Sequence, residues 1–226
     1  MHAFFAHTFF AYTLLPHALL AAALLGTMSS SPFAEATHRA YAQQDANELR
    51  ALLQSAPTRA DSLLVRYRLY PLTEEAAVLD GLPSSLPDGS AREYALLSGL
   101  WAYRAGEASF FSAIRYGRRS TDLLDKAKAR APHAPFVLLV EGQSLLFRPS
   151  IAGKDPAAAA GRFARLADRV DQQGSTGISR TEAQVWRCLA LSEAGQTGEA
   201  QELNAQLRAR ALPPLYRQFL EDPPDV

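Results

Sequence analysis

The sequence predicts an all-α protein built from antiparallel helix pairs, and three observations carry that prediction. Apolar residues recur at spacings of three and four along most of the chain, which is the period of one helix face. Ala, Leu, Arg, Glu and Gln dominate these stretches, and all five are good helix formers. Pro and Gly gather between the periodic stretches, and no stretch shows the strict alternation of a half-buried strand.

The chain opens on an apolar segment that predicts export. Phe9 to Gly26 is apolar, and the run beyond Pro16 is shorter than the roughly 20 residues of a bilayer span, so it suits the core of a secretory signal. Ala34-Glu35-Ala36 has the A-x-A pattern of a cleavage site. We therefore expect a signal peptide over 1–36, a mature domain over 37–226 and a periplasmic or secreted location. An uncleaved anchor and an ordinary buried helix are the alternatives.

The first half of the mature chain predicts four helices and one long loop. Ser90 and Glu93 form the Ser-x-x-Glu pattern of a capping box, which marks the start of the third helix. A stretch rich in Pro, Gly and Ser precedes it and predicts a loop. The expected order is Thr37–Ser55, Arg59–Tyr70, a loop over Leu79–Gly89, Ser90–Ala105 and Ser109–Ala131.

The second half predicts five more helices. Asp155-Pro156 reads as an N-cap followed by Pro at the first helical position. Gln173 to Gly177 is polar and Gly-rich, which predicts a loop. The expected helices are Pro135–Phe147, Pro156 to about Gln172, Ser179–Ala194, Thr197–Ala209 and a short closing helix within Leu212–Val226.

The turns inside the helix pairs share a pattern. Ala105–Ala108, Ala152–Pro156 and Ala194–Ala200 each contain a Gly with a small residue shortly after it. Gly ends a helix in the left-handed conformation, and small side chains let two antiparallel helices approach closely. Gly99 and Gly142 offer the same close approach in mid-helix, and Cys188 stands in the matching place of the last pair.

These turns resemble the tetratricopeptide repeat family, although the repeats here are spaced more widely than is usual there. The likeness covers about Glu93 to Leu212 and is greatest over Leu123–Val170, where Ala129–Pro132 looks like a repeat boundary. It is weak over Thr37–Tyr70. The resemblance implies an α-α superhelix, a solenoid of about four antiparallel helix pairs whose stability comes from burial between neighbours.

The resemblance also implies a binding groove. In that family the first helix of each pair lines the concave face of the superhelix. Carried onto this chain, the groove would be lined by Glu93, Tyr103, Arg104, Gln143, Phe147, Glu182, Ser192 and Glu193.

Composition and motifs argue against several other functions. Lys plus Arg equals Asp plus Glu, 23 against 23, so no overall field favours nucleic acid, or a membrane once the signal is removed. Cys188 is the only cysteine, which excludes an intrachain disulfide. The chain has no zinc-protease, phosphate-loop, nucleophile-elbow or dinucleotide motif. We expect no metal, no cofactor and no catalysis.

Several residues allow both a structural and a functional interpretation. Cys188 reads as a packing residue, with a reactive or intermolecularly bonded thiol as the alternative. Glu141, inside an apolar helix, reads as solvated or arginine-paired, with a groove contact or a catalytic acid as the alternatives. Arg115, Arg118 and Arg119 read as a solvated face or as a contact for an anionic or acidic partner. The aromatic residues Tyr94, Trp101, Tyr103, Phe110, Phe111 and Tyr116 read mostly as core.

The sequence therefore predicts an exported helical-repeat scaffold that binds a partner protein or an extended peptide. It does not name the partner, and it is compatible with an oligomer. The alternative is a protein for small ligands, or an accessory subunit of the type associated with TRAP transporters. A deep apolar pocket would favour that alternative over peptide binding.

Overall fold

The structure, a computed structural model, describes residues 32–173 and 176–224, and the regular secondary structure in these ranges is helical. No strand occurs in these two ranges, so the prediction of an all-α fold is confirmed. The α-helices are α1 (Pro32–Ala42), α2 (Ala46–Gln54), α3 (Arg59–Thr73), α4 (Ala91–Gly106), α5 (Phe110–Arg130), α6 (Pro135–Phe147), α7 (Pro156–Gln173), α8 (Arg180–Glu193), α9 (Thr197–Arg208) and α10 (Pro214–Glu221). Two short 3₁₀ turns, η1 (Ala76–Leu79) and η2 (Ser150–Ala152), interrupt the connections.

The prediction of one helix over Thr37–Ser55 is wrong, because the chain breaks there into α1 and α2. Gln44 takes a left-handed backbone conformation, with φ of 60°. The Asp45 carboxylate then accepts a hydrogen bond of 2.9 Å from the backbone N–H of Glu48 and caps α2. A side-chain cap of this kind satisfies an amide that would otherwise lack a partner at the helix start.

From α3 onward the expected helices are confirmed to within a few residues at either end. The capping box at the start of α4 is complete. The Ser90 hydroxyl accepts a hydrogen bond of 3.2 Å from the Glu93 amide, and the Glu93 carboxylate accepts one of 2.8 Å from the Ser90 amide. Reciprocal capping fixes the point at which the loop that follows η1 enters the first turn of α4.

Close approach between helices depends on glycine at two positions. A methyl group at Gly142 of α6 would lie 2.6 Å from the ring of Phe163 in α7, and one at Gly99 of α4 would collide with the ring of Tyr67 in α3. Both rings therefore rest directly on helix backbone. The expectation that these glycines permit close packing is confirmed.

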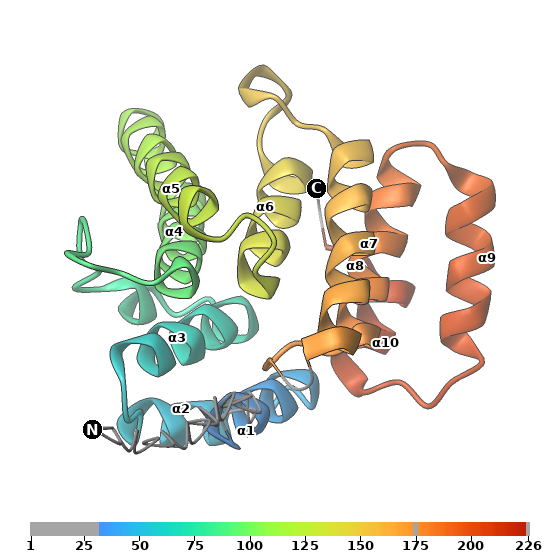
Figure 1. Cartoon of the computed structure of the whole chain (residues 1–226), viewed down its shortest axis with the longest axis horizontal. Helices are drawn as coiled ribbons and strands as arrows, with labels where there is room; N and C mark the ends of the chain where they lie inside the picture. The colour runs from blue at the N-terminus through green and yellow to red at the C-terminus, as the bar shows by residue number, and fades with distance from the viewer. Residues whose placement is uncertain (1–31, 174–175, 225–226) are drawn as a thin grey trace, which may run out of the picture.

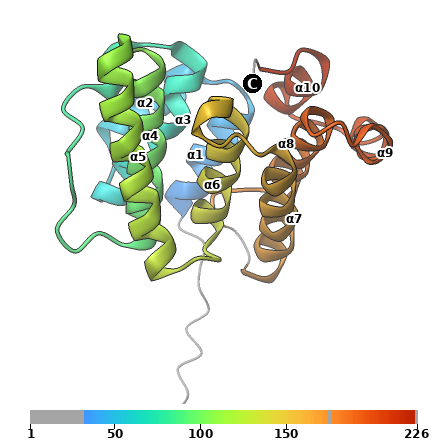
Figure 2. The ribbon, with the colours of Figure 1, turned by 90° about the horizontal axis from the view of Figure 1, so that it is seen from above.

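The helices form successive antiparallel pairs, α4 with α5, α6 with α7 and α8 with α9, as Figure 1 shows. The array bends back on itself. The first helix, α1, packs against α10, and the side chains of α3 reach those of α8. Figure 2 shows α9 at the outer edge of the molecule, where it packs chiefly against α8. Residues from both ends of the described chain thus share one core.

Most of the predicted signal peptide, 1–36, lies outside the described residues. The expected cleavage site, Ala34–Ala36, lies near the start of α1, and Ala34 is buried beside Gly177. Export and cleavage remain predictions. In the ranges that the structure describes, none of the helices combines the length and the apolar character that crossing a membrane requires.

Candidate functional site

Three of the eight residues expected in a groove, Tyr103, Gln143 and Glu182, contact side chains of α3. Tyr103 stacks on Tyr67 and Tyr70 of α3, with ring centroids 5.6 and 4.9 Å apart. The Tyr67 hydroxyl donates a hydrogen bond to the side-chain oxygen of Gln143. These polar groups are occupied by α3 of the same chain.

Glu182, the third of them, is fully buried. Its carboxylate accepts hydrogen bonds of 2.5 and 3.0 Å from the two terminal nitrogens of Arg68, which is itself 1% exposed. Arg68 also donates to the carbonyl of Gly177 at 3.3 Å and lies 4.5 Å over the ring of Tyr41. Burial alone would lower the pKa of Arg68, but the Glu182 carboxylate outweighs it and raises that pKa, which keeps the guanidinium charged.

The other five expected groove residues are spread over the surface. Glu93 accepts a hydrogen bond of 2.7 Å from Arg59, and Arg104 donates to the carbonyl of Leu79. Phe147 packs edge-on against Trp186, with centroids 5.9 Å apart. Ser192, on α8, is exposed. The carboxylate of the next residue, Glu193, pairs with the ammonium of Lys154 at 2.6 Å. The eight residues thus line no single surface, and their role in binding remains a prediction.

A different surface concentrates positive charge over aromatic rings. We call it the arginine–aromatic surface, and it consists of Trp101, Arg104, Arg115, Tyr116 and Arg119 from α4 and α5. The two rings lie 5.2 Å apart, centroid to centroid. The Arg119 guanidinium lies 4.6 Å over Trp101, and that of Arg115 lies 5.1 Å over Tyr116. Arg104 approaches both rings, at 6.0 and 5.8 Å.

The electrostatics of this surface favour an anion. Hydrogen bonds from Arg115 and Arg104 hold the pKa of Tyr116 below its ordinary value of 10.0. Among the described residues, only the carboxylate of Asp80 lies within 4.0 Å of the three guanidiniums, at 3.6 Å from Arg104. The arginines are therefore oriented by rings more than they are neutralised by carboxylates. Guanidinium groups that stack on rings keep their edges free to bind carboxylate or phosphate.

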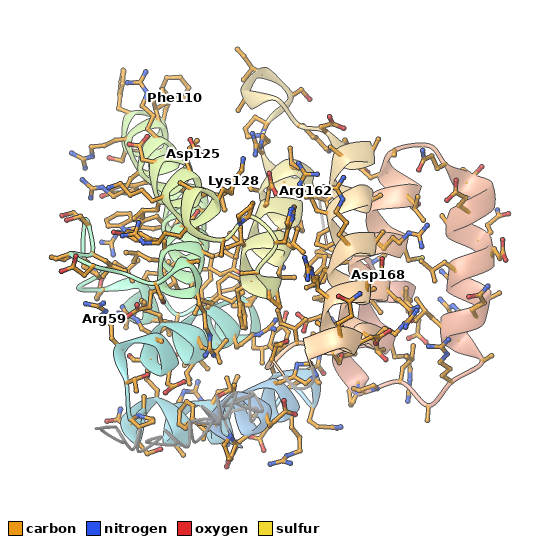
Figure 3. All side chains as sticks on the ribbon, viewed as in Figure 1. Arg59, Phe110, Asp125, Lys128, Arg162 and Asp168 are labelled. Carbon is orange, nitrogen blue, oxygen red and sulfur yellow. The ribbon has the colours of Figure 1, made fainter. Side chains whose placement is uncertain are left out.

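The expectation that the aromatic residues are mostly core holds for Tyr94 and Trp101 and is wrong for Phe110 and Phe111. Phe110 is 74% and Phe111 is 84% exposed. Both residues precede the part of α5 that packs against α4, and they lie on the side of α5 that faces away from it. Ile114, one turn further on, is also exposed. Figure 3 shows Phe110 at the free end of α5.

A second charged cluster joins α5, α6 and α7. The Glu141 carboxylate accepts a hydrogen bond of 2.6 Å from Arg162 and lies 3.1 Å from the Lys128 ammonium. In Figure 3 the side chains of Lys128 and Arg162 point toward one another across α6. Burial would raise the pKa of Glu141, but Arg162 and Lys128 together lower it. Glu141 is thus arginine-paired, and its contacts tie three helices together.

Two cavities near the C-terminal end of the described part are small. The two pockets, of about 210 and 140 Å³, lie beside α9 and α10, and the larger one is lined mainly by neutral residues, with Cys188 among them. Sites for drug-sized ligands usually occupy about 300–1,000 Å³. Within the described ranges, no group of three or more His, Cys, Asp or Glu side chains could hold a metal ion. Cys188 is buried at 4% exposure, as a packing residue should be.

Comparison of the chain with protein-family models, with curated proteins and with solved structures finds no match. The arginine–aromatic surface and the exposed apolar end of α5 therefore have to be interpreted from their own chemistry. Sequence reasoning found the arginine cluster of α5. It missed Trp101 and Arg104 as parts of the same surface, because their contact with α5 depends on how the α4–α5 hairpin closes.

Proposed function

We propose that this protein is an exported helical-repeat interaction module, similar in architecture to tetratricopeptide proteins, that binds an acidic segment of a partner protein. The observation that carries the proposal is the arginine–aromatic surface, where three guanidiniums stand over Trp101 and Tyr116 with one carboxylate nearby. Aromatic residues and arginine are enriched at the energetic centres of protein interfaces. An acidic segment with apolar side chains would satisfy both components.

The proposal places recognition on the outer side of the α4–α5 pair rather than inside the bend of the array. Inside the bend, Tyr103, Gln143 and Glu182 already have partners from α3. On the α4–α5 pair, Arg115 is exposed and Arg119 and Tyr116 are half-buried. A partner can reach these groups without moving a helix. The two cavities beside α9 and α10, of about 210 and 140 Å³, are small for a drug-sized ligand.

The proposal can be tested by selecting binders from a displayed random-peptide library with the full-length protein. We expect the selected peptides to be enriched in Asp and Glu and to bind more weakly as salt rises, because ion pairs at an exposed surface are screened. Arg119→Glu should weaken their binding at least tenfold while the circular dichroism spectrum stays unchanged. Arg165→Glu, an equal charge change on the exposed side of α7, serves as the matched control.

Two results would count against this function. One is a selected set without acidic enrichment. The other is equal binding of the acidic peptides by the Arg119→Glu variant and the wild-type protein, with both proteins folded.

A further inference from the structure

The outward side of α5 carries a patterned surface that no helix of the described chain covers. Successive helical residues are rotated by 100°, so residues three and four apart share a side. Buried residues of α5 define the side that faces α4: Ser120, Leu123, Leu124 and Ala127. The opposite side is exposed along its length and carries Phe110, Phe111, Ile114, Arg115, Arg118, Thr121, Asp122, Asp125 and Ala129. Figures 1 and 2 both show α5 on the outside of the array.

Charge changes sign along this outward side. The first three turns carry Arg115 and Arg118 and no carboxylate, and the next turns carry Asp122 and Asp125. Asp122 has no ion-pair partner among the described residues, and Asp125 has only Lys128, at 3.8 Å. The last turns also carry Lys126, Lys128 and Arg130, but these lie on the flanks of α5, where Lys126 and Arg130 lie 6.0 and 4.7 Å from the centroid of the Tyr94 ring of α4. Along the middle of the outward side, basic residues therefore precede the level of Ser120 and acidic residues follow it, so this strip complements an inverted copy of itself.

We propose that the protein forms a two-fold symmetric dimer in which α5 packs antiparallel against α5 of a second copy. One register places Arg118 opposite Asp122 of the other copy and Arg115 opposite Asp125. The same register places Phe111 opposite Ala129, whose small side chain leaves room for the ring. All three pairs are symmetric about the level of Ser120, so the two-fold axis crosses α5 there, and each pair forms twice.

The antiparallel orientation follows from the charges. In a parallel pair of α5 helices each residue would face its own copy, which would bring Arg118 against Arg118 and Asp122 against Asp122. Like charges in direct opposition are unfavourable, whereas the antiparallel pair makes only unlike contacts between these residues. At both ends of the contact, Phe110, Phe111 and Ile114 would lie against Arg130, Ala129 and Lys126 of the other copy. The alkyl stems of the two basic side chains would cover part of the apolar surface while their charges stay in water.

The dimer should be a weak one. A helix of 21 residues is about 31 Å long, and one such contact lies at the small end of specific interfaces, below about 1,200 Å² in total. The dimer is argued independently of the proposed partner binding, although Arg115 belongs to both surfaces and the two contacts would compete for it. Its test uses Arg118 and Asp122, which lie outside the arginine–aromatic surface, so the loss of one property can be distinguished from the loss of the other.

The decisive experiment is sedimentation equilibrium of the full-length chain and its charge-reversed variants over a wide range of protein concentration. We expect the wild-type chain to dimerise. Arg118→Asp alone and Asp122→Arg alone should each be monomeric, because each reversal places like charges in opposition. An equimolar mixture of the two variants should form a one-to-one heterodimer, and the double variant R118D/D122R should dimerise again. Arg165→Glu should leave the dimer unchanged.

Several results would overturn the proposal. A wild-type chain that stays monomeric at every concentration would do so, and its flotation with phosphatidylglycerol vesicles would reassign the apolar end of α5 to a lipid surface. Single variants that still dimerise would move the interface elsewhere. A mixture that stays monomeric, with both variants folded by circular dichroism, would refute this register.

Discussion

At the scale of single residues, the Arg68–Glu182 pair is the most consequential contact. The two side chains are separated by 114 positions in sequence and are almost completely buried. Removing two charges from water is costly, and the cost is offset only when each is paired with good geometry. Arg68 meets that condition through two hydrogen bonds to one carboxylate and the contact with the Tyr41 ring.

Glu182→Gln should lower the free energy of unfolding by roughly 3–5 kcal/mol, because it leaves the Arg68 charge buried and uncompensated. Urea denaturation measures the difference. The double variant R68M/E182L removes both charges and should recover most of the loss, since apolar residues can replace a buried ion pair at little cost. A double variant as unstable as Glu182→Gln would show that the packing, and not the charge, is at fault.

The two kinds of helical glycine should respond oppositely to an added methyl group. Gly142→Ala should destabilise the protein by about 1–3 kcal/mol, because the new Cβ would overlap the Phe163 ring. Gly117→Ala in α5 meets nothing within 4 Å and should stabilise it by about 0.5–1 kcal/mol. Thermal unfolding of the two variants provides the comparison. Equal effects would contradict the close contact of α6 with α7.

The ion pairs of Glu141 should make the free energy of unfolding depend on pH in the acid range. Since Arg162 and Lys128 lower its pKa in the folded protein, the unfolded chain binds a proton more readily. The stabilisation is therefore complete above the ordinary pKa of 4.5 and is lost as the pH falls through the lower folded value. Urea titrations at several pH values should show a steeper acid loss for the wild-type protein than for Glu141→Gln. If the free energy of unfolding fell equally with pH in both proteins, the ion pairs of Glu141 would not be the cause of the acid sensitivity.

At the scale of elements, local sequence signals account for most helix boundaries. Ser90, Thr58 and Ser179 each accept a hydrogen bond from an amide in the first turn of the helix that follows them. Each of these hydrogen bonds joins residues three apart, so the local sequence is enough to predict them. Gln44 occupies the left-handed position between α1 and α2, where a Gly would be usual. Without a Gly or Pro to mark the break, the sequence predicted one helix there.

Ser90→Ala removes one half of the capping box and should cost about 1 kcal/mol of stability. The effect should be local as well, since the η1 loop enters α4 at this residue. Urea denaturation gives the global loss, and hydrogen exchange of the first amides of α4 gives the local one. Glu93 also pairs with Arg59, so Arg59→Ala, which spares the box, separates the cap from that ion pair.

The fold class, the helix order and the close-packing glycines could thus be predicted from the sequence, and the arrangement of side chains between distant helices could not. The sequence around Glu182 predicts a helix, but only the contact of Glu182 with Arg68 of α3 shows that its side of the helix is buried. Phe110 and Phe111 look like core by composition. They are exposed because they lie on the side of α5 that faces away from α4, and only the packing of the α4–α5 hairpin shows which side that is.

At the scale of the whole molecule, the bend of the array couples its two ends. An open solenoid can unfold repeat by repeat, because each repeat contacts only its neighbours. Here α1 packs on α10 and α3 is tied to α8, so the middle of the chain is enclosed by contacts between remote segments. The larger part of the molecule should behave as one cooperative unit.

Native-state hydrogen exchange tests this coupling. The slowest amides of α3 and of α8 should exchange with the same free energy, equal to that of global unfolding. In Glu182→Gln the two values should separate, because the contact between the halves is weakened. Values that already differ in the wild-type protein would indicate that the two halves open independently.

The position of Cys188 has a practical consequence for measuring motion. Its thiol lies beneath α9, with Sγ 3.5 Å from the carbonyl of Ala200, and burial raises its pKa. Because Cys188 is buried and lines the cavity between α8, α9 and α10, alkylation of its thiol should be slow and should depend on the opening of this region. The chain has no other cysteine. The native protein therefore has one thiol for labelling, and the rate of its alkylation would report how often the contact between α8, α9 and α10 opens, without any introduced probe.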